Sequence, residues 1–150
     1  MYSNHVCIEM STNSANEGFA RMAVAAFIAP QDPTVAVLNE VKTAVSEAVT
    51  NCIIHGYEQE PGVVYMGLSI EDGLLRVSIR DNGTGISDIE GAREALFTSK
   101  PELERSGMGF TMMESFMDSL DINSSPGRGT EVVMTKQLKT GKQPKSMVSA

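Results

Sequence analysis

The stretch that decides the fold reads LNEVKTAVSEAVTNCIIHG over residues 38–56. Its apolar residues recur every three to four positions: Leu38, Val41, Val45, Ala48 and Cys52. This spacing is typical of the buried face of an α-helix. We expect the helix to begin at Asp32-Pro33, where a capping side chain precedes a proline, and to run to about His55, with Gly56 as its stop.

Strands are predicted on both sides of this helix. The runs 63–70 and 74–81 alternate apolar and polar residues, and Asp72-Gly73 lies between them, which together favour a β-hairpin. A weaker alternation over 5–10 indicates an opening strand. The runs 120–122 and 130–135 indicate two more strands, joined by a turn at 124–127.

Three further helices are predicted. One apolar face is expected to consist of Phe19, Met22, Ala23, Ala26 and Phe27, in a helix that Pro30 ends. A helix over 110–117 should bury its methionines and phenylalanines. A short helix is expected over 89–96, within a glycine-rich stretch that is otherwise loop.

This element order predicts an α+β fold, a two-layer sandwich with the helices on one face of a mixed, mostly antiparallel sheet. We expect one domain over residues 1–137, followed by a disordered tail over 138–150. Four lysines and no acidic residue lie in the last fifteen residues.

Composition excludes several classes of protein. The net charge of −7 argues against binding of nucleic acid. No apolar run is long enough to span a membrane, and no signal peptide is visible. Cys7 and Cys52 are too few for a disulfide framework and are interpreted as reduced core thiols. These features predict a cytoplasmic protein.

Three motifs are candidates for chemistry, and each alone has a structural alternative. Glu47 and Asn51 lie one helical turn apart. They are either a base beside a magnesium ligand or ordinary polar residues at the margin of the buried helix face. The segment 81–85, DNGTG, allows the backbone to approach a flat ligand or forms an ordinary turn. The segment 106–109, SGMG, opens a helix as an anion site or is a connector. The P-loop, G-x-G-x-x-G and eukaryotic protein-kinase patterns are absent.

The order of these motifs resembles the N-box, G1-box and G2-box of the GHKL ATP-binding superfamily, which has the Bergerat fold. The pattern is Glu47-x-x-x-Asn51, Asp81-x-Gly83-x-Gly85 and Gly107-x-Gly109, followed by Gly129-Thr130. Within that superfamily, three segments are similar to the stand-alone anti-sigma factor kinases of endospore-forming bacteria. They are 46–51 (SEAVTN), 54–58 (IHGYE) and 98–110 (TSKPELERSGMGF).

The resemblance implies a role for each matching residue. Glu47 is expected to accept the proton of the attacking hydroxyl, and Asn51 to bind the Mg²⁺ on the phosphates of ATP. Asp81 is expected to accept a hydrogen bond from the adenine amino group. The remaining ATP-binding residues implied are Gly83, Gly85, Arg105, Ser106, Gly107, Met108, Gly109 and Thr130. Arg21 matches a partner-contact position, with an ordinary solvated helix charge as the alternative.

The resemblance also implies a function. Such proteins bind a sporulation sigma factor, sigma F, and keep it from RNA polymerase. They phosphorylate a serine of an anti-anti-sigma factor, using ATP and Mg²⁺, and they work as homodimers. The alternative that the sequence leaves open is a non-catalytic sigma-binding module gated by ATP. A gyrase-like or chaperone-like ATPase is disfavoured because such enzymes continue into a transducer domain after the ATP site.

Overall fold

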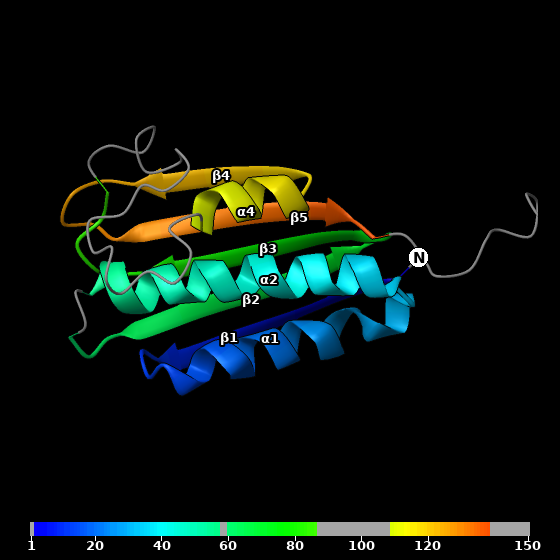
Figure 1. Cartoon of the computed structure of the whole chain (residues 1–150), viewed down its shortest axis with the longest axis horizontal. Helices are drawn as coiled ribbons and strands as arrows, with labels where there is room; N and C mark the ends of the chain where they lie inside the picture. Colours follow the sequence, from blue (N-terminus) through cyan, green and yellow to red (C-terminus); the bar gives the residue numbers. More distant parts are fainter. Residues whose placement is uncertain (1, 58–59, 87–108, 139–150) are drawn as a thin grey trace, which may run out of the picture.

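A five-stranded sheet carries the helices on one face in the computed structural model, which describes residues 2–57, 60–86 and 109–138 (Figure 1). The strands are β1 (Ser3–Ser11), β2 (Val63–Glu71), β3 (Leu74–Asp81), β4 (Ser119–Ser124) and β5 (Thr130–Gln137). The helical elements are α1 (Ala15–Ile28), η1 (Ala29–Gln31), α2 (Val35–Asn51), η2 (Cys52–Gly56) and α4 (Gly109–Phe116). This architecture confirms the predicted α+β sandwich.

The strand order is β1-β2-β3-β5-β4, so β1 and β4 are the edges. All four pairings between the described strands are antiparallel. The expected mixed character is therefore not seen among these strands. Antiparallel neighbours need only hairpin turns, and two of the four pairs are hairpins.

The predicted central hairpin is present with nearly its predicted limits. Asp72 and Gly73 both have positive φ, at 49° and 84°. Positive φ at both central residues is the geometry that matches the twist of the two strands, and Asp-Gly supplies it.

Helix α2 begins later than predicted. Asp32 is not its cap, because this residue ends η1 in the left-handed region with φ 51°. Thr34 caps the helix instead, and its Oγ1 accepts a hydrogen bond of 3.1 Å from the N–H of Val37. The chain then continues past Asn51 into a π-helical turn, η2, which ends at Gly56. Such turns are rare and are frequently found at functional sites.

The buried face of α1 also differs from the prediction. Phe19 is 53% exposed and Met22 is 65% exposed. The residues of α1 that are buried are Ala20, Val24, Phe27 and Ile28. Phe27 is therefore buried as expected, whereas Phe19 and Met22 lie outside the buried face. The sequence fits two overlapping periodic patterns, which share Phe27.

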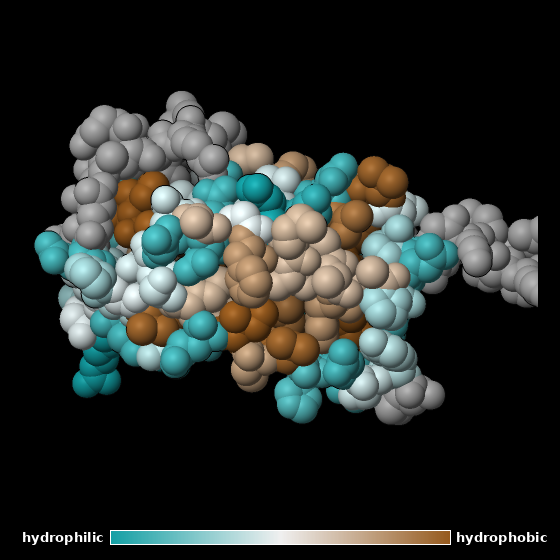
Figure 2. Space-filling model, turned by 90° about the horizontal axis from the view of Figure 1, so that it is seen from below, coloured by the Kyte–Doolittle hydropathy of each residue, from teal (hydrophilic) through white to brown (hydrophobic). Residues whose placement is uncertain are grey.

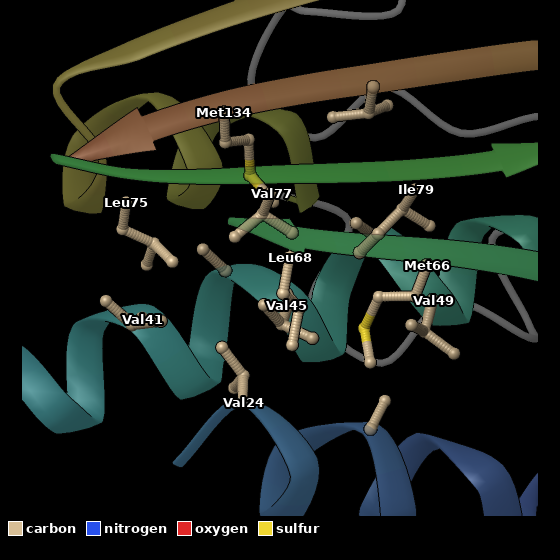
Figure 3. Close-up of a cluster of buried hydrophobic side chains, with 14 of the residues drawn as sticks. Val24, Val41, Val45, Val49, Met66, Leu68, Leu75, Val77, Ile79 and Met134 are labelled. Atoms are coloured by element: carbon tan, nitrogen blue, oxygen red, sulfur yellow. The ribbon is translucent and has the colours of Figure 1, made fainter. Parts of the chain in front are cut away.

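The core lies between the sheet and helix α2. Figure 3 shows Val41, Val45 and Val49 of α2 between Val24 of α1 and the side chains of the strands. These three valines have no exposed surface. Each contributes about 1.5–3 kcal/mol through burial of its side chain. Helix α2 thereby occupies the middle of the helical layer, between α1 and α4 (Figure 1).

The two cysteines have different environments. Cys52 is buried, as expected, whereas Cys7 is exposed on the edge strand β1, so its predicted place in the core is wrong. At the other end of the described chain, the N–H of Leu138 donates to the carbonyl of Gly73 at 2.8 Å. The predicted helix over 89–96 and residues 139–150 of the predicted tail lie outside the described residues.

Candidate functional site: a buried carboxylate beside the end of helix α2

Asp81 forms the first part of the site, at the end of β3. Its side chain is 3% exposed, and its Oδ1 accepts a hydrogen bond of 2.9 Å from the N–H of Gly83. The thiol of Cys52 and the backbone of Thr130 supply further hydrogen bonds. Burial nevertheless outweighs these donors and raises the pKa of Asp81. A carboxylate has more acceptor sites than these donors use, so it is suited to accept a further hydrogen bond from a donor group of a ligand.

Close backbone contacts surround this carboxylate. A Cβ on Gly56 would lie 2.7 Å from Oδ2 of Asp81, and one on Gly83 would lie 1.6 Å from the carbonyl oxygen of Gly56. A side chain at Gly56 would displace the Asp81 carboxylate, and one at Gly83 would require the backbone to move. The predicted turn residues therefore serve to bring the end of η2 against the end of β3.

Hydrogen bonds fix the loop after β3. The N–H of Thr84 donates to the Gly56 carbonyl at 2.7 Å, and the N–H of Gly127 donates to the Thr84 carbonyl at 2.7 Å. The N–H of Ile86 donates to Ser124 Oγ at 2.7 Å. Gly85, between them, has φ 78°, which favours glycine. The loop is thus held between η2 and the β4–β5 turn.

Thr130 lies beside Asp81, as predicted, because the two residues are partners in the β3–β5 register. Its hydroxyl shares a hydrogen bond of 2.8 Å with Ser124 Oγ. The structure therefore brings together Asp81, Gly83, Gly85 and Thr130.

Glu47, Asn51 and Gly109 form the second part of the site. A Cβ on Gly109 would lie 3.4 Å from Glu47 Oε2 and 3.3 Å from the amide nitrogen of Asn51. The carboxylate and the amide therefore converge on the first residue of α4. Free N–H groups at a helix start favour a negatively charged ligand.

The two parts adjoin through consecutive residues of one helix. Asn51 faces Gly109, and Cys52 contacts Asp81. The acid and amide predicted from the sequence thus lie on the same side of the sheet as the Asp81 pocket. Arg105, Ser106, Gly107 and Met108 lie outside the described residues.

Arg21 lies on α1, away from both parts. Its side chain is 40% exposed and forms an ion pair of 2.9 Å with Glu17. The sequence prediction of a partner contact is consistent with this exposure but is not tested by it.

Sequence reasoning missed two residues that shape the pocket. Cys52 was interpreted only as core, yet its thiol bonds Asp81. The hydroxyl of Tyr57 donates to the Val63 carbonyl at 2.7 Å and accepts from the N–H of Asn82 at 2.7 Å, so it holds the residue after Asp81 in place. Neither role has a signal in the local sequence, because each depends on a contact between distant segments.

The donor set near α4 fits a magnesium ion held mainly by phosphates. In residues 2–57, 60–86 and 109–138 no group of three or more histidine, cysteine or acidic residues is placed to hold a metal. Mg²⁺ characteristically takes one or two protein oxygen ligands together with substrate phosphates and water. The amide oxygen of Asn51 is a ligand of that kind.

The model of the histidine kinase-like ATPase domain matches residues 10–136. The anti-sigma F factor of Bacillus subtilis is 56% identical over 140 residues, which cover 93% of this chain and 96% of that protein. The chain belongs to the anti-sigma F factors, within the histidine kinase-like ATPases. As a member of this family it is an ATP-binding protein with kinase-type chemistry.

Solved structures share the fold of this anti-sigma factor family member. The RsbU and RsbW domains of a Mycobacterium tuberculosis protein match with a TM-score of 0.64 and 18% identity, over 90% of this chain and 32% of that one. Full-length ShkA in complex with AMPPNP matches with a TM-score of 0.56 and 20% identity, over 85% of this chain and 31% of that one. This chain therefore spans about a third of each of those proteins. Within its described part, the chain has no helix with the length and apolar character needed to cross a bilayer.

Proposed function

We propose that this protein transfers the γ-phosphoryl group of ATP to a serine of an anti-anti-sigma factor, and that it also binds and inhibits the sporulation sigma F factor. The observation that carries the transfer step is the convergence of Glu47 and Asn51 on Gly109 at the start of α4. A protein that only bound ATP would need the metal ligand but not the carboxylate beside it.

Each residue of the site has a role in this proposal. Asp81 accepts a hydrogen bond from the adenine amino group, with Thr130 beside it, while Gly83 and Gly85 let the backbone pass the base. Gly109 presents its backbone to the phosphates. The segment 105–108 contributes Arg105 as a cation and Ser106, Gly107 and Met108 as phosphate-binding backbone, on the strength of the sequence motif alone.

Asn51 is the proposed protein ligand of Mg²⁺. A Mg²⁺ ion held by Asn51 would supply neutralisation of the charge on the phosphates. Glu47 lies one turn before Asn51, and it accepts the proton that the serine hydroxyl loses when its oxygen bonds to the γ-phosphorus. The bond from the γ-phosphorus to the β,γ-bridging oxygen breaks, and ADP leaves with that oxygen. Phosphoryl transfer depends mainly on positioning and on charge neutralisation, which this arrangement of a base, an amide and a helix N-terminus supplies.

The proposed partners bind on the α1 side of the molecule. Arg21 is exposed there and is proposed as a contact to a partner protein. Figure 2 shows apolar side chains gathered on the face that contains α1, and Phe19 and Met22 are the large exposed apolar residues of that helix. Contiguous apolar surface of this kind marks protein interaction sites. We propose that the protein is a homodimer, and that it acts in the cytoplasm, where sigma factors meet RNA polymerase.

Labelled ATP tests the reaction class. The protein is incubated with γ-³²P-ATP, Mg²⁺ and the anti-anti-sigma factor of its organism, and phosphoserine is sought in the product. Glu47→Ala should keep ATP binding and lower the transfer rate by roughly 10²–10⁴-fold, the usual effect of a general base. Glu40→Ala is the matched control, because Glu40 lies on the same helix in an ion pair of 3.7 Å with Lys136.

The alternative function gives a different result. A binding module gated by ATP would capture sigma F in a nucleotide-dependent way and would yield no labelled protein. Full transfer by Glu47→Ala would remove Glu47 from the mechanism. Unchanged Mg²⁺-dependent ATP affinity in Asn51→Ala would show that the metal assignment is wrong.

A further inference from the structure

Helix α1 holds a partly buried carboxylate against the helix that carries Glu47 and Asn51. The Glu17 side chain is 16% exposed. Its Oε1 accepts a hydrogen bond of 2.9 Å from Ser46 Oγ, and its Oε2 accepts one of 3.0 Å from Thr50 Oγ1. Arg21 donates to Oε1 at 2.9 Å and closes the cluster on the solvent side. We call these four residues the Glu17 clasp.

We infer that Glu17 is a positioning residue for the nucleotide site, because the clasp sets the rotation of α2 about its own axis. Ser46 and Thr50 are one helical turn apart, and so are Glu47 and Asn51. The second pair follows the first by one residue, which is about 100° around the helix. A helix held at 46 and 50 by α1 therefore presents 47 and 51 in one fixed direction.

That direction is the start of α4. Figure 1 shows α2 lying between α1 and α4. The first pair bonds Glu17 of α1, and the second pair lies near Gly109 of α4. The hydroxyls of the first pair belong to residues that are only 5% and 7% exposed. The second pair lies within 3.3–3.4 Å of the position of a Cβ on Gly109. The second pair therefore lies next to the start of α4, and a rotation of α2 would carry it away from that position.

The size of the effect follows from helix geometry. Side-chain ends lie about 5–6 Å from a helix axis, so a rotation of about 10° moves them by about 1 Å. A displacement of about 1 Å in a reacting constellation can lower its rate by about 10²-fold. The valines at 41, 45 and 49 also oppose rotation, but apolar packing lacks the directionality of two hydrogen bonds to one carboxylate.

This inference rests on the proposed function, since it assigns Glu17 to the support of Glu47 and Asn51. Its first measurement does not use the transfer reaction. ATP binding is measured by titration calorimetry with Mg²⁺ and with EDTA, and the ratio of the two dissociation constants is the Mg²⁺ gain. If Asn51 is displaced, the Mg²⁺ gain should fall. The affinity for ATP in EDTA should stay the same, because it depends on recognition of adenine at Asp81.

Four variants separate positioning from simple loss of stability. Glu17→Ala leaves two buried hydroxyls without their acceptor, whereas the triple variant with Ser46→Ala and Thr50→Ala removes those hydroxyls as well and should recover thermal stability. Glu17→Gln keeps length and bridging capacity, because hydroxyls both donate and accept. Glu40→Ala removes a carboxylate from α2 outside the clasp.

The expected pattern is specific. Glu17→Ala and the triple variant should lose about 10-fold of the Mg²⁺ gain and about 10²-fold of the transfer rate at saturating ATP, as a 1 Å displacement predicts. Glu17→Gln should stay within about 3-fold of wild type because it retains the bridge, and Glu40→Ala should match wild type. Glu17→Ala also removes the ion pair that holds Arg21, so the transfer rate could change through an altered partner contact. The ATP-binding measurement contains no partner protein and therefore reports on the nucleotide site alone.

Two results would overturn the inference. One is a folded triple variant with the Mg²⁺ gain and transfer rate of wild type. The other is an equal loss of ATP affinity in Mg²⁺ and in EDTA, which would indicate general loosening. If wild type itself transfers no phosphate to serine, the proposed function fails, and the Mg²⁺ gain alone then decides the role of Glu17.

Discussion

Replacement of Asp81 by asparagine tests the pocket most directly. The substitution preserves size and removes the charge. The carboxylate accepts hydrogen bonds from the backbone at Gly83 and Thr130 and from the Cys52 thiol. An asparagine oxygen can keep the Gly83 bond of 2.9 Å. Its amide group then points a donor toward other donors, and toward the proposed position of the adenine amino group.

The structure sets the size of the expected loss. A hydrogen bond to a charged acceptor contributes about 1.5–3 kcal/mol, which corresponds to roughly 10–150-fold in ATP affinity. Stability should change less, because two effects oppose each other. Loss of the buried charge removes the desolvation that raises the pKa of Asp81, and the misdirected amide group introduces an unsatisfied donor.

The assay is a double-mutant cycle in which one change is made in the protein, at residue 81, and the other in the nucleotide, at its exocyclic amino group. Affinities of wild type and Asp81→Asn are measured by calorimetry for ATP and for purine riboside triphosphate, which lacks the exocyclic amino group. Wild type should prefer ATP by roughly the factor above, and the variant should lose that preference because the interaction has been removed from both sides. Thermal melting of both proteins provides the control for folding.

Either of two results would refute the reasoning. The variant could bind ATP as tightly as wild type, or it could keep the full preference for the amino group. In both cases the carboxylate at 81 would not read adenine, and the orientation proposed for ATP would be wrong.

Three other outcomes follow from the structure. The pKa of Asp81 is raised in the folded state, so protonation of this carboxyl favours folding, and that stabilisation is lost as pH rises through the raised pKa. Melting temperatures of wild type and Asp81→Asn should be compared at pH values from about 7 to 4. The melting temperature of wild type should rise relative to that of Asp81→Asn as pH falls. Iodoacetamide at mildly alkaline pH should label the exposed Cys7 in the native protein, and Cys52 only after unfolding. The reason is that burial raises the pKa of the Cys52 thiol well above its usual value. Mass spectrometry counts the labels, and labelling of both cysteines in the native protein would contradict the burial of Cys52. Gly109→Ala should change the melting temperature little, because residue 109 is the first of α4 and not in the helix interior. Its Cβ would lie 3.3 Å from the amide nitrogen of Asn51, so displacement of that amide should lower transfer by about 10-fold. An unchanged rate in the kinase assay would contradict this proximity.

Much of the fold could be predicted because its local signals are strong. The Asp72-Gly73 turn selects its hairpin by backbone geometry alone, and the apolar stripe of α2 fits one helical period. The face of α1 was predicted wrongly for a physical reason. Phe19 and Met22 satisfy the same periodicity as the residues that are buried, and only the packing distance to neighbouring elements selects between them.

The candidate site divides in the same way. Glu47, Asn51 and Asp81 were predicted because their spacing matches a known motif, and the structure gathers them with Gly83 and Gly109. The Cys52 thiol and the Tyr57 hydroxyl were missed because each meets its partner only after the sheet has formed. A hydrogen bond between segments about 25 residues apart leaves no trace in either segment alone.

The end of α2 explains how so few residues make the site. Neighbouring residues of its last turns have different partners: valines 45 and 49 face the core, 46 and 50 face Glu17, and 47 and 51 face Gly109, while Cys52, the first residue of η2, contacts Asp81. A helix advances about 100° per residue, so 45, 46 and 47 point in three different directions. Rotation of α2 would move 46 and 50 away from Glu17. The π-helical turn that follows then brings Gly56 against Asp81, where a regular helical turn would follow a different path. The precision that phosphoryl transfer requires therefore resides in the packing of this one helix.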